Sequence, residues 1–207
     1  MEIELLAVVT LSIFMTIWYL LAKRANLKRQ NKLWVQISKE IKRHSEKVGF
    51  RRLGSGAFQI SFKARPPLRV VEITFVLMDR ENFPHYIFQR ILRKKDEVYL
   101  KASFLCSPTF RVSSSRGSLS LVEGFSLGNL RLFSDKPSIA ASVLLDERIK
   151  ALTEGMEIKG ISVAPEEPHL IIRCNVNEET LKSLIPLAWK LALICCSSDK
   201  RGRTKSF

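Results

Sequence analysis

The sequence is poor in the residues that build metal sites and disulfide frameworks. It holds 3 histidines and 4 cysteines among 207 residues, and no histidine lies close in sequence to a cysteine or to another histidine. Because zinc sites need such close spacing, we expect neither a metal nor a cofactor. The cysteines show no paired spacing, and we expect all of them to be reduced thiols: Cys106, Cys174, Cys195 and Cys196.

Motifs of the common enzyme classes are also missing. The nucleophile-elbow pattern G-x-S-x-G does not occur. Gly54-Ser55-Gly56 precedes a strand pattern instead of opening a helix, so we expect a turn there and no phosphate loop. The paired carboxylates at 146–147, 166–167 and 178–179 fall at helix starts or turns, where solvation and the helix dipole explain them. We therefore expect a chain that is not an enzyme, and its catalytic residues stay unassigned.

Acidic residues are scarce relative to basic ones. The chain has 34 Lys and Arg against 20 Asp and Glu, a formal charge of +14. Residues 33–116 hold 17 basic and 7 acidic residues, whereas residues 117–199 hold 8 and 11. A basic segment attracts anionic lipid headgroups or nucleic-acid phosphates, and charge alone does not distinguish them. Besides lipid and nucleic acid, a third interpretation is a solvated basic surface with no anionic partner.

One long apolar run lies near the start of the chain. Leu5 to Ala22 contains 18 consecutive uncharged residues, which is long enough to cross a bilayer. A signal peptide would carry basic residues before the run, but Glu2 and Glu4 come first. An interfacial helix would show a polar face, and here the polar side chains are mainly small hydroxyls. We therefore predict a transmembrane helix over residues 5–22.

The basic residues around this run predict its orientation. Five of them follow the run closely and none precedes it: Lys23, Arg24, Lys28, Arg29 and Lys32. By the positive-inside rule, residues 1–4 should lie outside the cell and everything after residue 22 in the cytoplasm. We expect a single-pass protein of the cell membrane, with a basic juxtamembrane linker over 23–32, a cytoplasmic domain over 33–199 and a basic tail over 200–207.

The hydrophobic periods predict an α+β domain with a mainly antiparallel sheet and about four helices. Helices are expected over 27–48 (ended by Gly49), 82–95 (capped by Asn82), 138–154 (capped by Ser138) and 178–196 (capped by Asn177). Strands are expected over 57–64, 68–78, 97–105, 156–163 and 169–176, with short strands within 106–135. The order helix, strand, turn, strand, helix occurs at 27–95 and again at 138–196, which indicates either two pseudo-repeated α-β-β-α units or chance.

The last expected helix is apolar enough to be mistaken for a second span. Lys182 and Lys190 argue against this, because a lysine at the centre of a spanning helix costs about 3 kcal/mol. Its apolar residues also form a stripe that can face a sheet. We therefore expect a core helix.

These observations favour a membrane-anchored binding or scaffold module that acts at the inner membrane surface. We expect its basic residues to bind anionic headgroups and its second half to bind a protein partner. The residues assigned to the membrane surface are Lys23, Arg24, Lys28, Arg29, Lys32, Arg51, Arg52, Lys63, Arg65 and Arg69. The alternative is a membrane-tethered RNA- or ribosome-binding protein, although strand alternation places Phe58 and Phe62 on the core side. A less favoured alternative is an enzyme with a cleft near His85 or His169.

Overall fold

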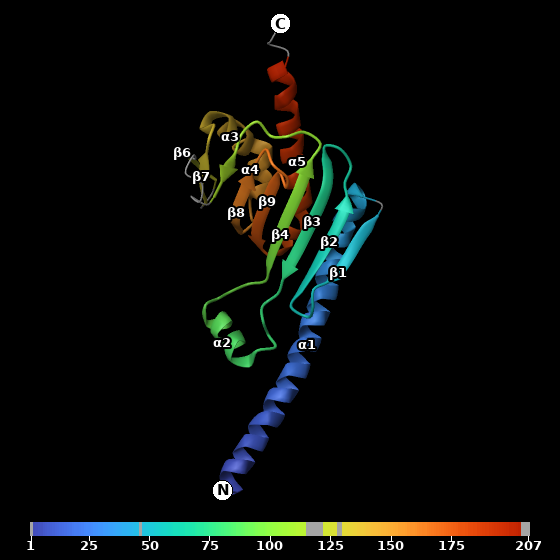
Figure 1. Cartoon of the computed structure of the whole chain (residues 1–207), viewed down its shortest axis with the longest axis vertical. Helices are drawn as coiled ribbons and strands as arrows, with labels where there is room; N and C mark the ends of the chain where they lie inside the picture. Colours follow the sequence, from blue (N-terminus) through green and yellow to red (C-terminus); the bar gives the residue numbers. More distant parts are fainter. Residues whose placement is uncertain (1, 46, 115–121, 128–129, 204–207) are drawn as a thin grey trace.

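The computed structural model describes residues 2–45, 47–114, 122–127 and 130–203, and its longest element is one helix at the N-terminus. Helix α1 (Glu2–His44) runs without a break from the apolar run into the folded domain (Figure 1). At 1.5 Å per residue, its 43 residues extend over about 65 Å. Residues 23–32, which we expected to be a linker, are therefore helical. The expected stop at Gly49 is wrong, because Val48 and Gly49 already belong to strand β1.

Among these residues, nine strands form one antiparallel sheet in the order β1-β2-β3-β4-β9-β8-β5-β7-β6. The strands are β1 (Val48–Arg52), β2 (Ala57–Lys63), β3 (Leu68–Val76), β4 (Glu97–Phe104), β5 (Val112–Ser113), β6 (Val122–Leu127), β7 (Leu130–Ser134), β8 (Ile158–Val163) and β9 (Leu170–Asn175). The α+β class and the mainly antiparallel sheet are confirmed; the strands expected at 57–64 and 68–78 pair as β2 and β3, and those expected at 156–163 and 169–176 also pair, as β8 and β9. Of the segment 106–135, where short strands were expected, residues 115–121 and 128–129 lie outside the described part of the chain.

One face of the sheet is covered by helices and the other is exposed. On β2, the side chains of Phe58, Ile60 and Phe62 are buried on the covered face, whereas Ser61 and Lys63 are exposed on the other. The Phe58 ring stacks on Phe75 of β3 with ring centroids 4.7 Å apart. This alternation follows from the two-residue period of a strand, which places successive side chains on opposite faces.

Helices α1 and α5 (Glu178–Arg203) lie behind the sheet in Figure 1 and supply most of this cover. Leu33, Ile37 and Ile41 of α1 are fully buried. On α5 the fully buried side chains are Leu184, Ile185, Leu187, Ala188, Leu191 and Ala192. The expected core helix is confirmed, with the Asn177 side chain accepting a hydrogen bond from the Thr180 amide at 2.6 Å. It continues past residue 196, the expected end, to Arg203.

The remaining helices are shorter than expected. Helix α2 (Phe83–Ile91) begins at its Asn82 cap, whose side chain accepts from the His85 amide, but it ends four residues before Lys95. Residues 138–154 divide into α3 (Pro137–Leu144) and α4 (Glu147–Thr153). Asp146 caps α4, and the Ser138 cap is wrong because Ser138 lies inside α3. The two expected units also differ in their last helix, since α2 has no buried residue whereas α5 forms the core.

The cysteines depart from the expectation that all are reduced. Cys106, just after β4, and Cys196, in α5, form a disulfide with a Cα–Cα distance of 5.5 Å. They are 90 residues apart in sequence, so no local spacing could indicate the pair. Cys174 and Cys195 are buried and take no part in this disulfide, and burial raises the pKa of each thiol to about 12. Neither of these two thiols is therefore a reactive one at neutral pH.

Candidate functional site

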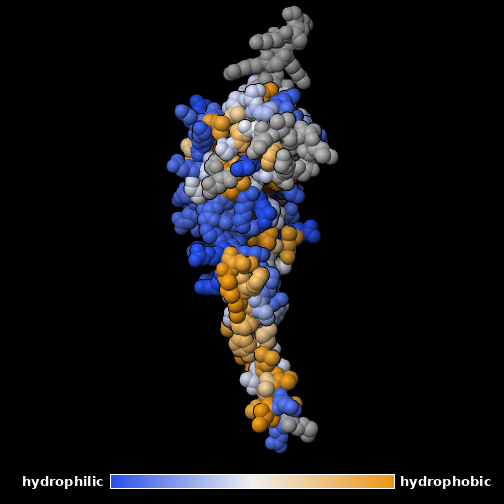
Figure 2. All heavy atoms as spheres, turned by 90° about the vertical axis from the view of Figure 1, so that its left-hand side faces the viewer, coloured by the Kyte–Doolittle hydropathy of each residue, from blue (hydrophilic) through white to orange (hydrophobic). Residues whose placement is uncertain are grey.

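The N-terminal half of α1 extends away from the domain with its large apolar side chains exposed. Leu5 is 67% exposed, Leu11 62% and Ile17 52%. Figure 2 shows this half as mostly hydrophobic surface that ends below a hydrophilic band. The hydroxyls of Thr10 and Ser12 donate to carbonyl oxygens four residues back at 2.8 Å, so they need no partner from outside the helix. α1 is long and apolar enough to span a membrane; α5 passes the same test of length and composition but is half buried.

The ten basic residues predicted for the membrane surface divide into two groups. Seven lie on or beside α1 close to the apolar run: Lys23, Arg24, Lys28, Arg29, Lys32, Arg51 and Arg52. The height of the two β1 residues follows from Arg52, because its guanidinium donates to the Asn31 side chain at 3.1 Å, and Arg51 lies one strand residue farther from the apolar run. Asn31 lies about 14 Å along the helix beyond Ala22.

The other three, Lys63, Arg65 and Arg69, lie at the opposite end of the domain and form the distal group. The Arg65 amide donates to the carbonyl of His44, the last residue of α1, at 3.2 Å. His44 is about 33 Å along the helix beyond Ala22. Antiparallel pairing causes this separation, since Arg52 aligns with Phe58 at one end of the β1-β2 pair and Val48 with Phe62 at the other. The structure therefore does not bring the ten residues together.

Electrostatic screening decides which group can respond to a lipid surface. The Debye length at physiological ionic strength is about 8 Å. The membrane-proximal group lies within roughly two such lengths of the end of the apolar run, whereas the distal group lies about four away. Arg69 is in addition paired with Glu167 at 3.1 Å. Of the two groups, only the membrane-proximal one is close enough for its charges to act on an anionic surface at the end of the apolar run.

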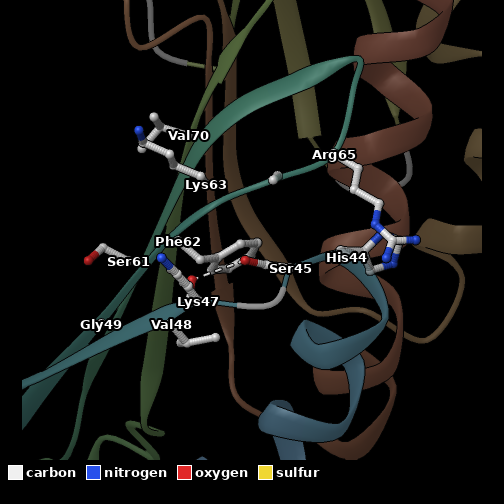
Figure 3. Close-up of a pocket in the computed structure, with 11 residues that line it drawn as sticks. His44, Ser45, Lys47, Val48, Gly49, Ser61, Phe62, Lys63, Arg65 and Val70 are labelled. Carbon is white, nitrogen blue, oxygen red and sulfur yellow. Dashed lines mark hydrogen bonds between the residues drawn. The ribbon is translucent and has the colours of Figure 1, made fainter.

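Lys63 and Arg65 of the distal group border a hollow of about 750 Å³ at the end of α1 (Figure 3). Its charged or titratable lining residues are His44, Lys47, Lys63 and Arg65, with Ser45 and Ser61 beside them, and Phe62 is among its apolar residues. Burial lowers the pKa of His44, with a smaller raising contribution from Glu40 and lowering contributions from Arg43 and Arg65. The hollow therefore lies at the end of α1 opposite the apolar run.

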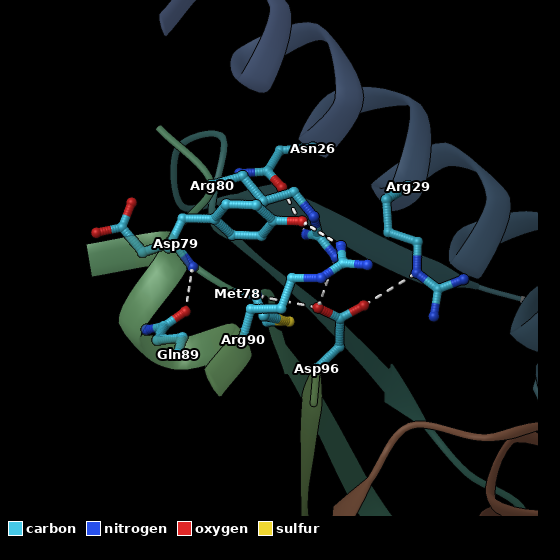
Figure 4. Close-up of polar contacts among 9 residues, drawn as sticks. Asn26, Arg29, Met78, Asp79, Arg80, Gln89, Arg90 and Asp96 are labelled. Carbon is cyan, nitrogen blue, oxygen red and sulfur yellow. Dashed lines mark hydrogen bonds and ion pairs between the residues drawn. The ribbon is translucent and has the colours of Figure 1, made fainter. Parts of the chain in front are cut away.

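A network around Asp96 fixes the membrane-proximal end of the domain to α1 (Figure 4). The Asp96 carboxylate is 5% exposed and pairs with Arg29 of α1 at 3.0 Å and with Arg80 at 3.3 Å. It also accepts a hydrogen bond from the Met78 amide at 3.0 Å. Arg80 donates in turn to Asn26 of α1 at 2.7 Å. Arg29 therefore has a structural partner, and the segment between β3 and α2 is fixed against α1 directly above the apolar run.

The Gly54-Ser55-Gly56 segment is a turn, as expected. Gly54 has a φ of +100°, which a residue with a Cβ rarely adopts. The Gln30 side chain of α1 donates to the carbonyls of Gly54 and Ser55 at 2.9 and 2.8 Å. Carbonyl oxygens, which repel phosphate, therefore face the helix here.

Helix α2 was not assigned to the site from the sequence, but the structure places it beside the apolar run. The Phe83 ring contacts Phe14 and Trp18 with centroids 5.3 and 4.7 Å away. The Trp18 indole donates to the Arg80 carbonyl at 2.9 Å. In Figure 2 an apolar patch at the level of α2 joins the apolar surface of α1. The signal in the sequence was the apolar spacing of Pro84, Ile87, Phe88 and Ile91, followed by Arg93, Lys94 and Lys95.

The exposed face of the sheet carries mixed charge. Glu97 accepts hydrogen bonds from Lys159 at 2.6 Å, Tyr99 at 2.8 Å and Arg173 at 3.0 Å. Burial raises the pKa of Glu97, but these hydrogen bonds together outweigh it, and the net pKa lies below the ordinary value. The Arg173 guanidinium lies over the Tyr99 ring at 5.4 Å. Phe58 and Phe62 are buried, so they are not available to stack on bases. Tyr99 is an aromatic side chain on this face, but the charges around it largely neutralise one another. The face is therefore poorly suited to stacking bases.

The histidines named in the enzymatic alternative have structural roles. His169 is 4% exposed, and its Nδ1 accepts from the Phe104 amide at 2.9 Å. His85 lies on α2 with its Nε2 2.8 Å from the Gln89 amide nitrogen. Among the described residues, no group of three or more His, Cys, Asp or Glu is arranged to hold a metal ion. Neither histidine has a carboxylate as its hydrogen-bond partner in these contacts.

Comparison with known protein families found no family that matches this chain, and comparison with curated proteins found no significant match. The class that the structure defines is an α+β protein with an N-terminal helix long and apolar enough to span a membrane.

Proposed function

We propose that this chain is a single-pass membrane protein whose domain binds at the inner membrane surface, with anionic headgroups as ligands of its membrane-proximal group. The observation that supports this most directly is the continuity of α1. The same helix carries the exposed apolar run and, farther along, the fully buried Leu33, Ile37 and Ile41. An unbroken helix holds the domain at a fixed height, so its lower basic residues stay near the headgroups.

The proposed orientation places the domain in the cytoplasm. Its support is the cluster of basic residues after the apolar run, which the positive-inside rule assigns to the cytoplasm. The disulfide opposes it, because the cytoplasm keeps thiols reduced. In this proposal Cys106 and Cys196 are a dithiol in the cell, adjacent in the fold and ready to form the bond when the protein is oxidised.

The binding of anionic lipid can be tested on the full-length protein in nanodiscs that contain neutral and anionic phospholipids. The variant Lys28→Glu with Arg51→Glu changes two exposed members of the membrane-proximal group. The matched control, Lys63→Glu with Arg65→Glu, makes the same change of charge in the distal group. After extraction, we expect the wild type and the control to retain more anionic than neutral lipid, and the first variant to lose this preference. Equal losses in both variants, or no preference in the wild type, would contradict the proposal.

The alternative partner is RNA near the membrane, which would bind the same basic residues through its phosphates. Phosphate contacts make affinity fall steeply with salt, so binding is measured across salt concentrations. If the full-length protein in neutral nanodiscs does not bind RNA even at low salt, this alternative is excluded. The proposed protein partner of the second half can be sought by pull-down from detergent-solubilised membranes.

A further inference from the structure

The outward face of α2 is apolar although no other part of the described domain covers it. Pro84, Ile87, Phe88 and Ile91 recur at intervals of three and four residues, so they share one face of the helix. Ile87 is 42% exposed, Phe88 57% and Ile91 71%, and the next residue, Leu92, is 52% exposed. A face with this much apolar surface normally has a partner.

The position of α2 identifies that partner. Its other side packs on α1 through Phe83 and Tyr86, whose ring centroids lie 4.7 and 6.0 Å from that of Trp18. Phe14, which contacts Phe83, lies within the apolar run itself. Any bilayer that surrounds Phe14 must therefore extend to the outward face of α2. The hydrophobic patch in Figure 2 continues from α1 onto this helix without a hydrophilic break between them.

The polar border of α2 also matches a lipid surface. Gln89 faces the domain, where its Oε1 accepts from the Asp79 amide at 3.1 Å. At the C-terminal end Arg90, Arg93 and Lys94 are exposed. Helices with one apolar face and a basic border lie in the plane of the interface, with the apolar face about 5 to 10 Å inside it. Long basic side chains at such a border reach back to the headgroups.

We propose that α2 is an interfacial helix whose apolar face, formed by Ile87, Phe88 and Ile91, enters the leaflet from which the domain emerges. This inference rests on the proposed function only in requiring that α1 spans the bilayer. The occupant of the face is lipid and not a second copy or another protein. Two contacts, α1 and α2, then prevent the domain from rotating about the axis of α1, so the exposed face of the sheet keeps one direction relative to the membrane.

The test measures how deeply α2 enters the bilayer in the full-length protein. Ile91→Cys is labelled with an environment-sensitive fluorophore, and the protein is reconstituted into vesicles whose lipids carry a quencher near the headgroup or deep in the acyl chain. Phe88→Cys is a second site on the same face. The protein is oxidised before labelling, so that the native cysteines do not compete for the label: two are then bonded and two are buried. Leu11→Cys is the control within the apolar run, and Val35→Cys, which is 56% exposed on α1 beyond it, is the control outside the bilayer.

We expect the probe at residue 91 to lose more fluorescence to the shallow quencher than to the deep one, the probe at residue 11 to lose more to the deep one, and the probe at residue 35 to lose little to either. If residue 11 is quenched and residues 88 and 91 behave like residue 35, the inference about α2 is wrong while the anchor stands. If the probes at residues 88 and 91 are shielded from water but no lipid quencher reaches them, protein covers the face. This result would also show that the inference about α2 is wrong. An unquenched probe at residue 11 would refute the anchor itself.

Discussion

The Trp18 indole donates a hydrogen bond to the Arg80 carbonyl at 2.9 Å, and this bond joins the end of the apolar run to the segment before α2. The two residues are 62 positions apart in sequence. Arg80 also contacts Asn26 and Asp96, so one short segment connects the apolar run, the basic part of α1 and the start of β4. The position of α2 against α1 depends on this connection.

The first prediction concerns that bond. Trp18→Ala removes the indole donor and the ring on which Phe83 packs, so α2 should open more often. The loss of about 1 kcal/mol corresponds to roughly fivefold faster exchange of amide hydrogens in α2. The control is Trp189→Ala, because Trp189 makes a similar bond to the Pro66 carbonyl, at 3.3 Å, far from α2. Hydrogen exchange in nanodiscs measures both, and equal exchange of residues 83–91 in the two variants would contradict the account.

The second prediction concerns the buried carboxylate. Asp96→Asn leaves Arg29 and Arg80 without their anion in a mostly buried setting. Removing one partner of such a network should lower the free energy of unfolding by about 3 kcal/mol. Glu167→Gln, which breaks the exposed pair with Arg69, should cost about 0.5 kcal/mol or less. Denaturant unfolding in one detergent gives both values. A small loss of unfolding free energy in the Asp96 variant would show that the network does not stabilise the fold as proposed.

The third prediction concerns acid stability. Since the pKa of Glu97 is lower in the folded protein than its ordinary value of 4.5, folding favours the charged carboxylate. The stability that this group contributes is fully present above pH 4.5 and is lost as the pH falls through the folded pKa. Glu97→Gln should therefore be less stable than the wild type at neutral pH, and the difference should shrink below pH 4.5. Thermal unfolding across pH tests this, and a difference that grows in acid would show that the sign is wrong.

The fourth prediction concerns Cys106 and Cys196. A bond that closes a loop of 90 residues should raise the free energy of unfolding by about 2 to 4 kcal/mol. The oxidised protein should therefore unfold at a higher denaturant concentration than the reduced protein. In Cys106→Ser the midpoint should not respond to reductant. Rapid thiol trapping in intact cells should find the pair reduced, and a pair trapped fully oxidised would contradict the cytoplasmic orientation.

Much of the fold could be predicted from sequence because it depends on local periodicity. The alternation of Phe58, Ile60 and Phe62 places them on the core face of a strand whatever the neighbouring strands are. The Asn82 and Asn177 caps act within their own helices. Gly49 is an exception: a glycine that resembles a helix stop lies within β1, because pairing with Ser61 outweighs the local signal.

Less of the site could be predicted from the sequence, because which residues lie close together depends on how distant parts of the chain pack. Arg52 and Lys63 are close in sequence, but antiparallel pairing places them at opposite ends of the β1-β2 pair. The Cys106–Cys196 bond depends on where the end of β4 meets α5. The apolar spacing of α2 was visible in the sequence, but only the contacts of Phe83 with Phe14 and Trp18 place its outward face beside the apolar run.

We propose that α1 crosses the membrane and leaves the domain on the cytoplasmic side. The most direct test of this proposal adds protease to intact cells that produce the full-length chain, and then to the same cells after their membrane is opened. We predict that the fragment containing residues 23–207 is protected in intact cells and digested once the membrane is open. Digestion of the domain from outside intact cells would contradict the account.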